Sequence, residues 1–177
     1  APLLQAELAP VADAYQAAKQ RAGLLDFLDL LVCARDLLRG DASVRADMQA
    51  RFTHYFVDEF QDTDPLQAEI LLLLAAADPA TNEWRSAATV PGKLFLVGDP
   101  KQSIYRFRRA DVAIYEQVKQ QLAASGADVV QLTASFRSVP QIQSAVNAAF
   151  APRMSGSADG SQAAYVPLEA VRADVAE

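Results

Sequence analysis

One run of the sequence constrains the fold more than any other, residues 51–65, RFTHYFVDEFQDTDP. Its aromatic and β-branched residues 55–57 are typical of a buried central strand, and this strand ends in two adjacent carboxylates, Asp58 and Glu59. Asp64 and Pro65 then predict a helix start, with Asp64 as N-cap, Pro65 in the first turn and Gln67 completing a capping box. This order is typical of an α/β protein, in which ligands bind at the carboxyl ends of parallel strands.

The same order recurs twice further along the chain. Residues 94–97 (LFLV) and 129–132 (VVQL) are mainly apolar and predict strands, and helices are expected after Asp111 and near Pro140. The polar, proline-containing interval 75–92 around Trp84 predicts a surface loop. Three strands that alternate with helices predict a parallel sheet with flanking helices.

Helices also precede this sheet. Apolar residues recur at helical spacing over 11–38, and Gly23 indicates a break between two helices. Gly40 and Asp41 indicate a stop and a new cap before a third helix over 44–51. We therefore expect a helical segment over 1–50, an α/β region over 51–150 and a linker-like tail over 151–177, in which residues 155–161 read SGSADGS.

Composition limits the class of protein. The 177 residues are 51% hydrophobic and 21% charged, as in a soluble globular protein. No apolar run approaches the roughly 20 residues needed to cross a bilayer, and no charged leader precedes an apolar segment, so we expect a cytoplasmic protein without a membrane partner. The net charge of −6 argues against a surface that binds nucleic acid everywhere, but cations cluster within residues 101–109.

Three loops follow the three predicted strands: DEFQD at 58–62, DPKQS at 99–103 and SFRS at 135–138. On one parallel sheet they would share an edge. Their side chains suit a nucleotide, because carboxylates can hold a metal and polarise a water, glutamine can contact a phosphate, and arginine can neutralise developing charge.

The same loops carry a family resemblance. Residues 57–63 (VDEFQDT) resemble motif II of the UvrD/Rep group of superfamily 1 helicases, residues 97–108 (VGDPKQSIYRFR) resemble motif III, and residues 132–138 (LTASFRS) resemble motif IV. Their order and spacing make the resemblance specific over residues 51–150, and residues 25–31 (LDFLDLL) are similar to the helix before motif II. The DPKQ form of motif III is most similar to the AddA and RecB branch, which processes double-strand DNA breaks.

The resemblance implies a RecA-like sheet, ATP and Mg²⁺ as cofactors, and ATP-driven movement along single-stranded DNA in repair and recombination. It implies that Asp58 holds Mg²⁺ through water and that Glu59 is the base for the attacking water. Gln102 would sense the γ-phosphate, Arg137 would act on it as an arginine finger, and Phe136 would stack on adenine. The implied DNA-facing residues are Tyr105, Arg106, Phe107, Arg108 and Arg109, and aromatic rings flanked by cations independently suit single-strand binding.

Two departures accompany this resemblance. No stretch reads G-x-x-x-x-G-K-[ST]; residues 91–94 (PGKL) have the Gly-Lys pair but no earlier glycine and no hydroxyl. The family's motifs V and VI are also missing, so we expect an internal fragment of a longer helicase, inactive alone, whose parent acts on DNA ends with a nuclease or helicase partner subunit. In addition, Arg109 occupies a position where relatives have glycine; if that position needs positive φ, arginine would be strained.

Two other functions remain open. Asp58 with Asp99 and Lys101 fits the acid, acid-x-lysine arrangement of a metal-dependent nuclease, although Gln102 and Arg137 would then have no role. The second is a non-catalytic module that grips DNA or a partner subunit through a degenerate helicase fold.

Several residues also have plainer interpretations. The two carboxylates alone could be a solvated strand end, Tyr105 and Phe107 could pack in the core, and Arg137 could be a surface cation. We expect Cys33 to be a small core residue and Lys19 to lie on a solvated helix face.

Overall fold

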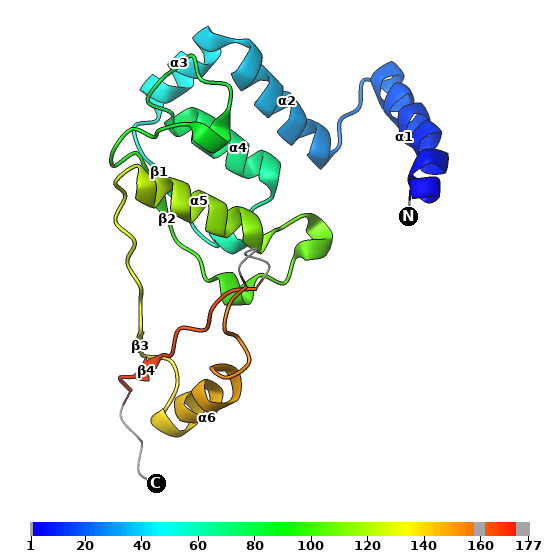
Figure 1. Cartoon of the computed structure of the whole chain (residues 1–177). Coiled ribbons are helices and arrows are strands. Elements are labelled where there is room, and N and C mark those ends of the chain that lie inside the picture. Colours follow the sequence, from blue (N-terminus) through cyan, green and yellow to red (C-terminus); the bar gives the residue numbers. More distant parts are fainter. Residues whose placement is uncertain (1, 158–161, 173–177) are drawn as a thin grey trace.

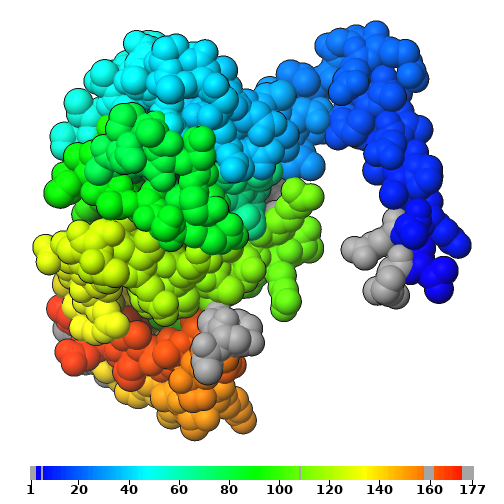
Figure 2. All heavy atoms as spheres, turned by 45° about the horizontal axis from the view of Figure 1, so that its top comes forward, coloured from blue at the N-terminus to red at the C-terminus, as the bar shows by residue number. Residues whose placement is uncertain are grey.

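The computed structural model describes residues 2–157 and 162–172, without the side chains of Pro2, Gln5 and Arg108. Figure 1 shows three parts: helix α1 stands apart, helices α2 to α5 are grouped with strands β1 and β2, and α6 lies with β3 and β4 in a second unit. In Figure 2, α1 projects from the body as an arm joined through α2. Among the described residues no helix combines the length and apolar character needed to span a membrane.

The three predicted helices before the sheet and the break at Gly23 are confirmed, although the first helix begins well before residue 11. Helix α1 covers Pro2–Ala22, α2 covers Phe27–Gly40, and the chain turns at Gly23, whose φ is 65°. Asp26 begins α2 with a capping box, since its side chain accepts from Asp29 N while Asp29 accepts from Asp26 N. Asp41 caps α3, Ala42–Arg51, through the N–H groups of Ser43 and Val44.

The first two predicted strands are also confirmed, and they pair in parallel. Strand β1, Tyr55–Val57, lies beside β2, Leu94–Leu96, with Phe56 opposite Phe95. Helix α4, Pro65–Ala75, lies between them in the chain and has the expected N-terminus, in which Asp64 and Gln67 form a capping box around Pro65. The short helix η2, Trp84–Ser86, follows before β2.

The core lies between α4 and α5, which covers Val112–Ala124 after the N-cap Asp111. Its buried members are Phe60, Ala68, Leu72, Leu73, Trp84, Ile114, Val118 and Leu122. The prediction of a surface loop over 75–92 is wrong at Trp84, which is buried. The amide of Gln121 donates to Trp84 O at 2.7 Å and to Ala87 O at 2.9 Å and fixes this interval to α5.

Only one face of the β1–β2 sheet is covered. Val57, Leu94 and Leu96 pack against the core, whereas Phe56 and Phe95 are 76% and 59% exposed, with ring centroids 5.8 Å apart. Side chains alternate between the faces of a strand, and the described helices pack on one face only. The prediction that the strand at 55–57 is buried on both faces is therefore wrong for this chain.

The third predicted strand is wrong. Residues 129–132 have no strand structure, and Leu132 is 81% exposed. A shorter strand, β3, Ala134–Ser135, pairs in parallel with β4, Glu169–Ala170, in a separate two-stranded sheet. Apolar β-branched residues form a strand only where a neighbouring strand offers hydrogen bonds, and this segment pairs with neither β1 nor β2.

The second unit is held together by helix α6, Pro140–Phe150. Asn147 accepts from Tyr165 OH at 2.7 Å and donates to Leu168 O at 2.8 Å, so it fixes the segment that leads into β4. The predicted helix is confirmed, although its apolar residue Ile142 is exposed. Residues 158–161 and 173–177 of the predicted tail lie outside the described part of the chain, and the boundaries at 50 and 150 remain predictions.

Two side chains differ from their predicted surroundings. Cys33 is exposed, so its predicted place in the core is wrong. The sequence pattern predicts the helix correctly but does not indicate which face of the helix packs against α4. Lys19 is buried at the end of α1, where its Nζ lies 2.7 Å from Asp26 Oδ2 and 2.6 Å from Asp29 Oδ2. The predicted solvated position of Lys19 is wrong because two carboxylates compensate its burial.

Candidate functional site at the carboxyl end of strand β1

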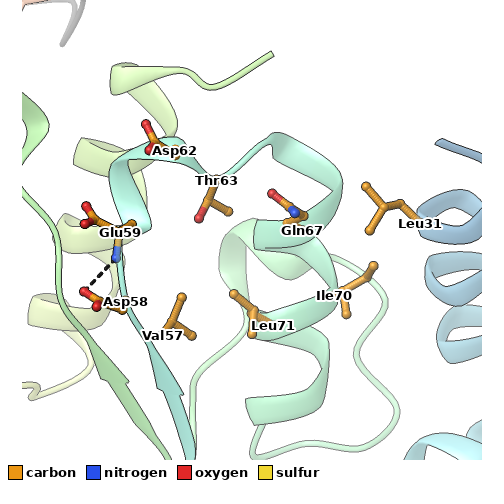
Figure 3. Close-up of a pocket in the computed structure, with 9 residues that line it drawn as sticks. All are labelled: Leu31, Val57, Asp58, Glu59, Asp62, Thr63, Gln67, Ile70 and Leu71. Carbon is orange, nitrogen blue, oxygen red and sulfur yellow. Dashed lines mark hydrogen bonds between the residues drawn. The ribbon is translucent and has the colours of Figure 1, made fainter. Parts of the chain in front are cut away.

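Asp58 and Glu59 lie directly after β1, and both are exposed. Glu59 has φ 53° and ψ 40°, a left-handed conformation that is uncommon for a residue other than glycine. The backbone N–H of Glu59 donates to Asp58 Oδ1 at 2.9 Å (Figure 3). This bond fixes the turn in which the two adjacent carboxylates leave the strand.

Gln61, in the short helix η1, Phe60–Asp62, connects this turn to the next loop. Its side chain donates from Nε2 to Glu59 Oε2 at 2.5 Å and accepts at Oε1 from Asp99 N at 3.0 Å. Gln61 is 2% exposed, and a Cβ on Gly98 would lie 2.8 Å from its Oε1, so close packing also holds the amide. The sequence alone assigned no role to Gln61, although its position inside the run VDEFQDT, next to the two carboxylates, pointed to this site.

A cleft of about 460 Å³ opens beside the carboxylates. It lies between α2 and the β1–α4 connection, and Figure 3 shows Leu31 of α2 facing Ile70 and Gln67 of α4 across it. Asp62 also lines it, and Asp62 Oδ1 is buried without a hydrogen-bond partner among the described residues. The cleft thus combines apolar walls with an acidic end.

The two carboxylates suit a hard divalent cation that takes few of its ligands from the protein. No group of three or more potential His, Cys, Asp or Glu ligands occurs in the described residues. With these two adjacent carboxylates as ligands, a cation would complete its shell with water or phosphate oxygens, as Mg²⁺ does.

The second loop contains η3, Pro100–Gln102, at the carboxyl end of β2. Asp99 accepts from Lys101 Nζ at 2.9 Å and from Gln102 Nε2 at 3.0 Å. Burial raises the pKa of the Asp99 carboxyl, but the hydrogen bonds from Lys101 and Gln102 outweigh it and the net pKa is lowered. Asp99 is therefore ionised at neutral pH, and Gln102 is exposed beside it.

The aromatic and basic segment follows at once, in η4, Arg106–Arg108. Phe107 is 80% exposed, which excludes core packing in this structure, and Tyr105 is half-buried. Arg106 and Arg109 are exposed; the side chain of Arg108 is not among those that the structure describes. Arg109 has φ 73°, so this position does have the positive φ that was considered; the resulting strain stays a prediction.

Phe136 and Arg137 lie elsewhere. Both are exposed and follow β3, which lies in the second unit, apart from β1 (Figure 1). The expectation that three strand-end loops share one edge is therefore wrong; the structure brings together the first two only. The third loop is displaced because residues 129–132 do not join the β1–β2 sheet.

Fold and site together define an α/β protein with an acidic pair at the carboxyl end of a parallel strand, coupled to a second strand-end loop. The family described as UvrD/REP helicase N-terminal domain matches residues 2–123. The chain belongs to this helicase family.

Individual relatives agree with this assignment. The chain is 38% identical over 143 residues to an ATP-dependent helicase/nuclease subunit of Levilactobacillus brevis, covering 77% of this chain and 10% of the relative. The protein of the same name from Exiguobacterium sibiricum is 36% identical over 162 residues, 88% of this chain and 13% of the relative. The "DNA helicase II" of Escherichia coli (strain K12) is 37% identical over 138 residues, 78% of this chain and 17% of that protein. The chain thus spans less than a fifth of the length of these relatives.

Proposed function

We propose that this chain is the part of an ATP-dependent DNA helicase that activates the hydrolytic water and contacts single-stranded DNA. The observation that carries the proposal is the link between Glu59 and the loop that leads to Phe107: Gln61 bonds both Glu59 and Asp99. An acidic pair coupled to an exposed aromatic and basic segment suits an enzyme that uses ATP hydrolysis to move along DNA.

In the proposed site, Asp58 holds Mg²⁺ through water, and Glu59 orients and deprotonates the water that attacks the γ-phosphate. Bound Mg²⁺ would neutralise charge on the phosphates. Gln102, exposed beside Asp99, contacts the γ-phosphate. These roles follow the motif II and motif III assignments, which are part of the proposal.

The roles proposed for Phe136 and Arg137 require their loop to move toward the carboxylates. Their loop lies in the second unit, which residues 126–133 join to α5 without regular structure. We propose that this unit leads into a second RecA-like lobe and that Phe136 and Arg137 reach adenine and the γ-phosphate when the two lobes close. The roles of an adenine platform and an arginine finger depend on this movement.

The DNA-facing surface is formed by Tyr105, Arg106, Phe107, Arg108 and Arg109. We propose that it binds single-stranded DNA, and that the longer protein acts in repair and recombination at DNA ends with a partner subunit. Two of the relatives are each named as one subunit of a helicase/nuclease, which supports an association of this kind.

The test is ATP turnover by the longer protein that we propose contains this chain, with and without single-stranded DNA. We expect DNA-stimulated hydrolysis there. The 177-residue chain alone, whose sequence has no G-x-x-x-x-G-K-[ST], is expected to hydrolyse ATP at no appreciable rate. A longer protein that neither hydrolyses ATP nor moves on DNA would support a non-catalytic module instead, and metal-dependent DNA cleavage abolished by Lys101→Ala would support the nuclease.

A further inference from the structure

We propose that Gln61 is a positioning residue through which single-stranded DNA on the Tyr105–Phe107 segment controls the carboxylate of Glu59. This inference rests on the proposed function and adds a route of regulation to it. Gln61 itself touches neither nucleotide nor DNA in this proposal. It acts by placing the group that activates water.

The side-chain amide of Gln61 joins the loop after β1 to the loop after β2. Nε2 of Gln61 donates to Glu59 Oε2, and Oε1 of the same amide accepts from Asp99 N. Among the described residues, the Glu59 carboxylate has no other hydrogen-bond donor. The orientation of this exposed carboxylate therefore depends on where the Gln61 amide lies.

The backbone of Gln61 is also bonded to the second loop. Ser103 Oγ donates to the backbone O of Gln61 at 3.1 Å. The loop 99–103 is thus bound to Gln61 at its beginning, through Asp99, and at its end, through Ser103. A shift of this loop would move both the backbone and the amide of Gln61.

The loop 99–103 is close in the chain to the proposed DNA-binding segment. Only Ile104 separates Ser103 from Tyr105, and the Tyr105 ring lies 5.7 Å from that of Phe107. Tyr105 O accepts from Ala110 N at 3.2 Å, and Ala110 is buried, so residues 105–110 form a closed turn that is anchored through Ala110. A base stacked on Phe107 would act on this closed turn, and a shift of the turn would reach Ser103 through Ile104.

The surroundings of Gln61 limit how the amide can respond. Gly98 leaves no room for a Cβ beside Oε1, and Tyr115 OH donates to Gly98 O at 3.2 Å while its ring packs 5.8 Å from that of Phe60. The amide is therefore enclosed on the side away from Glu59. A displacement of Asp99 is expected to pass to the Glu59 carboxylate rather than to be absorbed by rotation of the amide.

The experiment compares Gln61→Met and Gln61→Glu in the longer protein. Methionine keeps the length and removes both hydrogen bonds, whereas glutamate keeps the acceptor for Asp99 N but loses the donor to Glu59. We expect both variants to bind nucleotide and single-stranded DNA as the wild type does, and to lose about 10-fold or more of the DNA-stimulated kcat, the size expected for a positioned hydrogen bond to a catalytic group.

The matched control is Gln121→Met, which removes a half-buried amide that donates to Trp84 O and Ala87 O, away from the carboxylates. It should lower the melting temperature and leave the ratio of kcat with DNA to kcat without DNA unchanged. A purely structural role for Gln61 would give the same pattern as this control, and that result would overturn the proposal, as would an unchanged ratio in a well-folded Gln61→Glu variant.

A second readout does not depend on turnover. In the 177-residue chain, the amide of Asp99 is protected by Gln61 Oε1, so its hydrogen exchange should accelerate in Gln61→Met and stay slow in Gln61→Glu. Unchanged exchange in Gln61→Met would show that the bridge does not hold in solution and would overturn the inference. If the wild-type longer protein shows no DNA-stimulated hydrolysis while the exchange result is as expected, the proposed function fails and the bridge stands.

Discussion

The ring of Phe107 lies 5.7 Å from the ring of Tyr105, at an interplanar angle of 56°, and Phe107 is nevertheless 80% exposed. A large aromatic ring that leans on one neighbour and offers its surface to solvent is suited to stack on a nucleic-acid base. Arg106, which separates the two aromatic residues in the chain, and Arg109 are both exposed.

Phe107→Ala is expected to weaken the affinity of the longer protein for single-stranded DNA by about 1–3 kcal/mol, the usual contribution of one stacked base. Fluorescence anisotropy with a labelled oligonucleotide measures this. Ile104→Ala is the control, because Ile104 is an exposed aliphatic residue in the same segment. Equal, small effects of both substitutions would show that Phe107 does not stack on DNA.

Arg109→Gly and Arg109→Ala separate the charge of Arg109 from its backbone. Both remove one cation, so both should lower the salt dependence of single-strand binding by about 0.7 in slope. Only glycine relieves the φ of 73°, so the glycine variant should be more stable to unfolding than the alanine variant by about 1 kcal/mol. Urea unfolding of the 177-residue chain measures the difference, and equal stabilities would mean that the position is not strained.

Arg109 also illustrates what the sequence could predict. For Arg109 the indication came from the family resemblance, in which glycine occupies this position. Local rules sufficed for the capping box of Asp64 and Gln67 and for the break at Gly23, because these conformations depend on near neighbours. The parallel pair at 55–57 and 94–97 was predicted correctly for a similar reason, because both strands are short apolar runs bounded by turn residues.

The ion cluster at the junction of α1 and α2 predicts a pH dependence. The hydrogen bond from Lys19 and the backbone N–H of Asp29 lower the pKa of Asp26 from 3.8 to about 2. Because this pKa is lowered on folding, the contribution of Asp26 to stability is full above pH 3.8 and is lost as the pH falls to about 2.

Lys19→Met should therefore raise the pKa of Asp26 toward 3.8, as measured by NMR titration of its carboxyl carbon. Lys119→Met is the control, since Lys119 pairs with Glu116 on α5. A wild-type Asp26 that already titrates at 3.8 would show that the cluster does not form in solution.

Arg45→Met is expected to destabilise the chain by about 2 kcal/mol. The Arg45 side chain is buried and donates to Thr81 O at 2.7 Å, to Asn82 Oδ1 at 3.2 Å and to Pro79 O. Methionine would leave these acceptors without their donor and detach the interval before Trp84. The comparison is Arg35→Met, which removes a pair with the exposed Asp36 and should change the free energy of unfolding by less than about 0.5 kcal/mol. Similar losses for both substitutions would contradict the anchoring role of Arg45.

What the sequence could not predict depends on residues far apart in the chain. Arg45 bonds carbonyls more than thirty positions away, and Gln61 bonds Asp99 across 38, so neither contact has a local pattern. The apolar run at 129–132 looks like a strand by composition, but no strand lies beside it to pair with among the described residues. For the same reason the sequence placed Phe136 and Arg137 at the carboxylate edge, where this structure does not place them.

Glu59→Gln in the longer protein tests the central claim most directly. The substitution preserves the size of the side chain and removes the base, so single-stranded-DNA-stimulated kcat for ATP should fall by about 10²–10⁴-fold while nucleotide affinity is retained. Glu116→Gln makes the same chemical change on α5 and should leave kcat unchanged. Turnover by Glu59→Gln at the wild-type rate would contradict the assignment of the β1 carboxylates to an ATPase site.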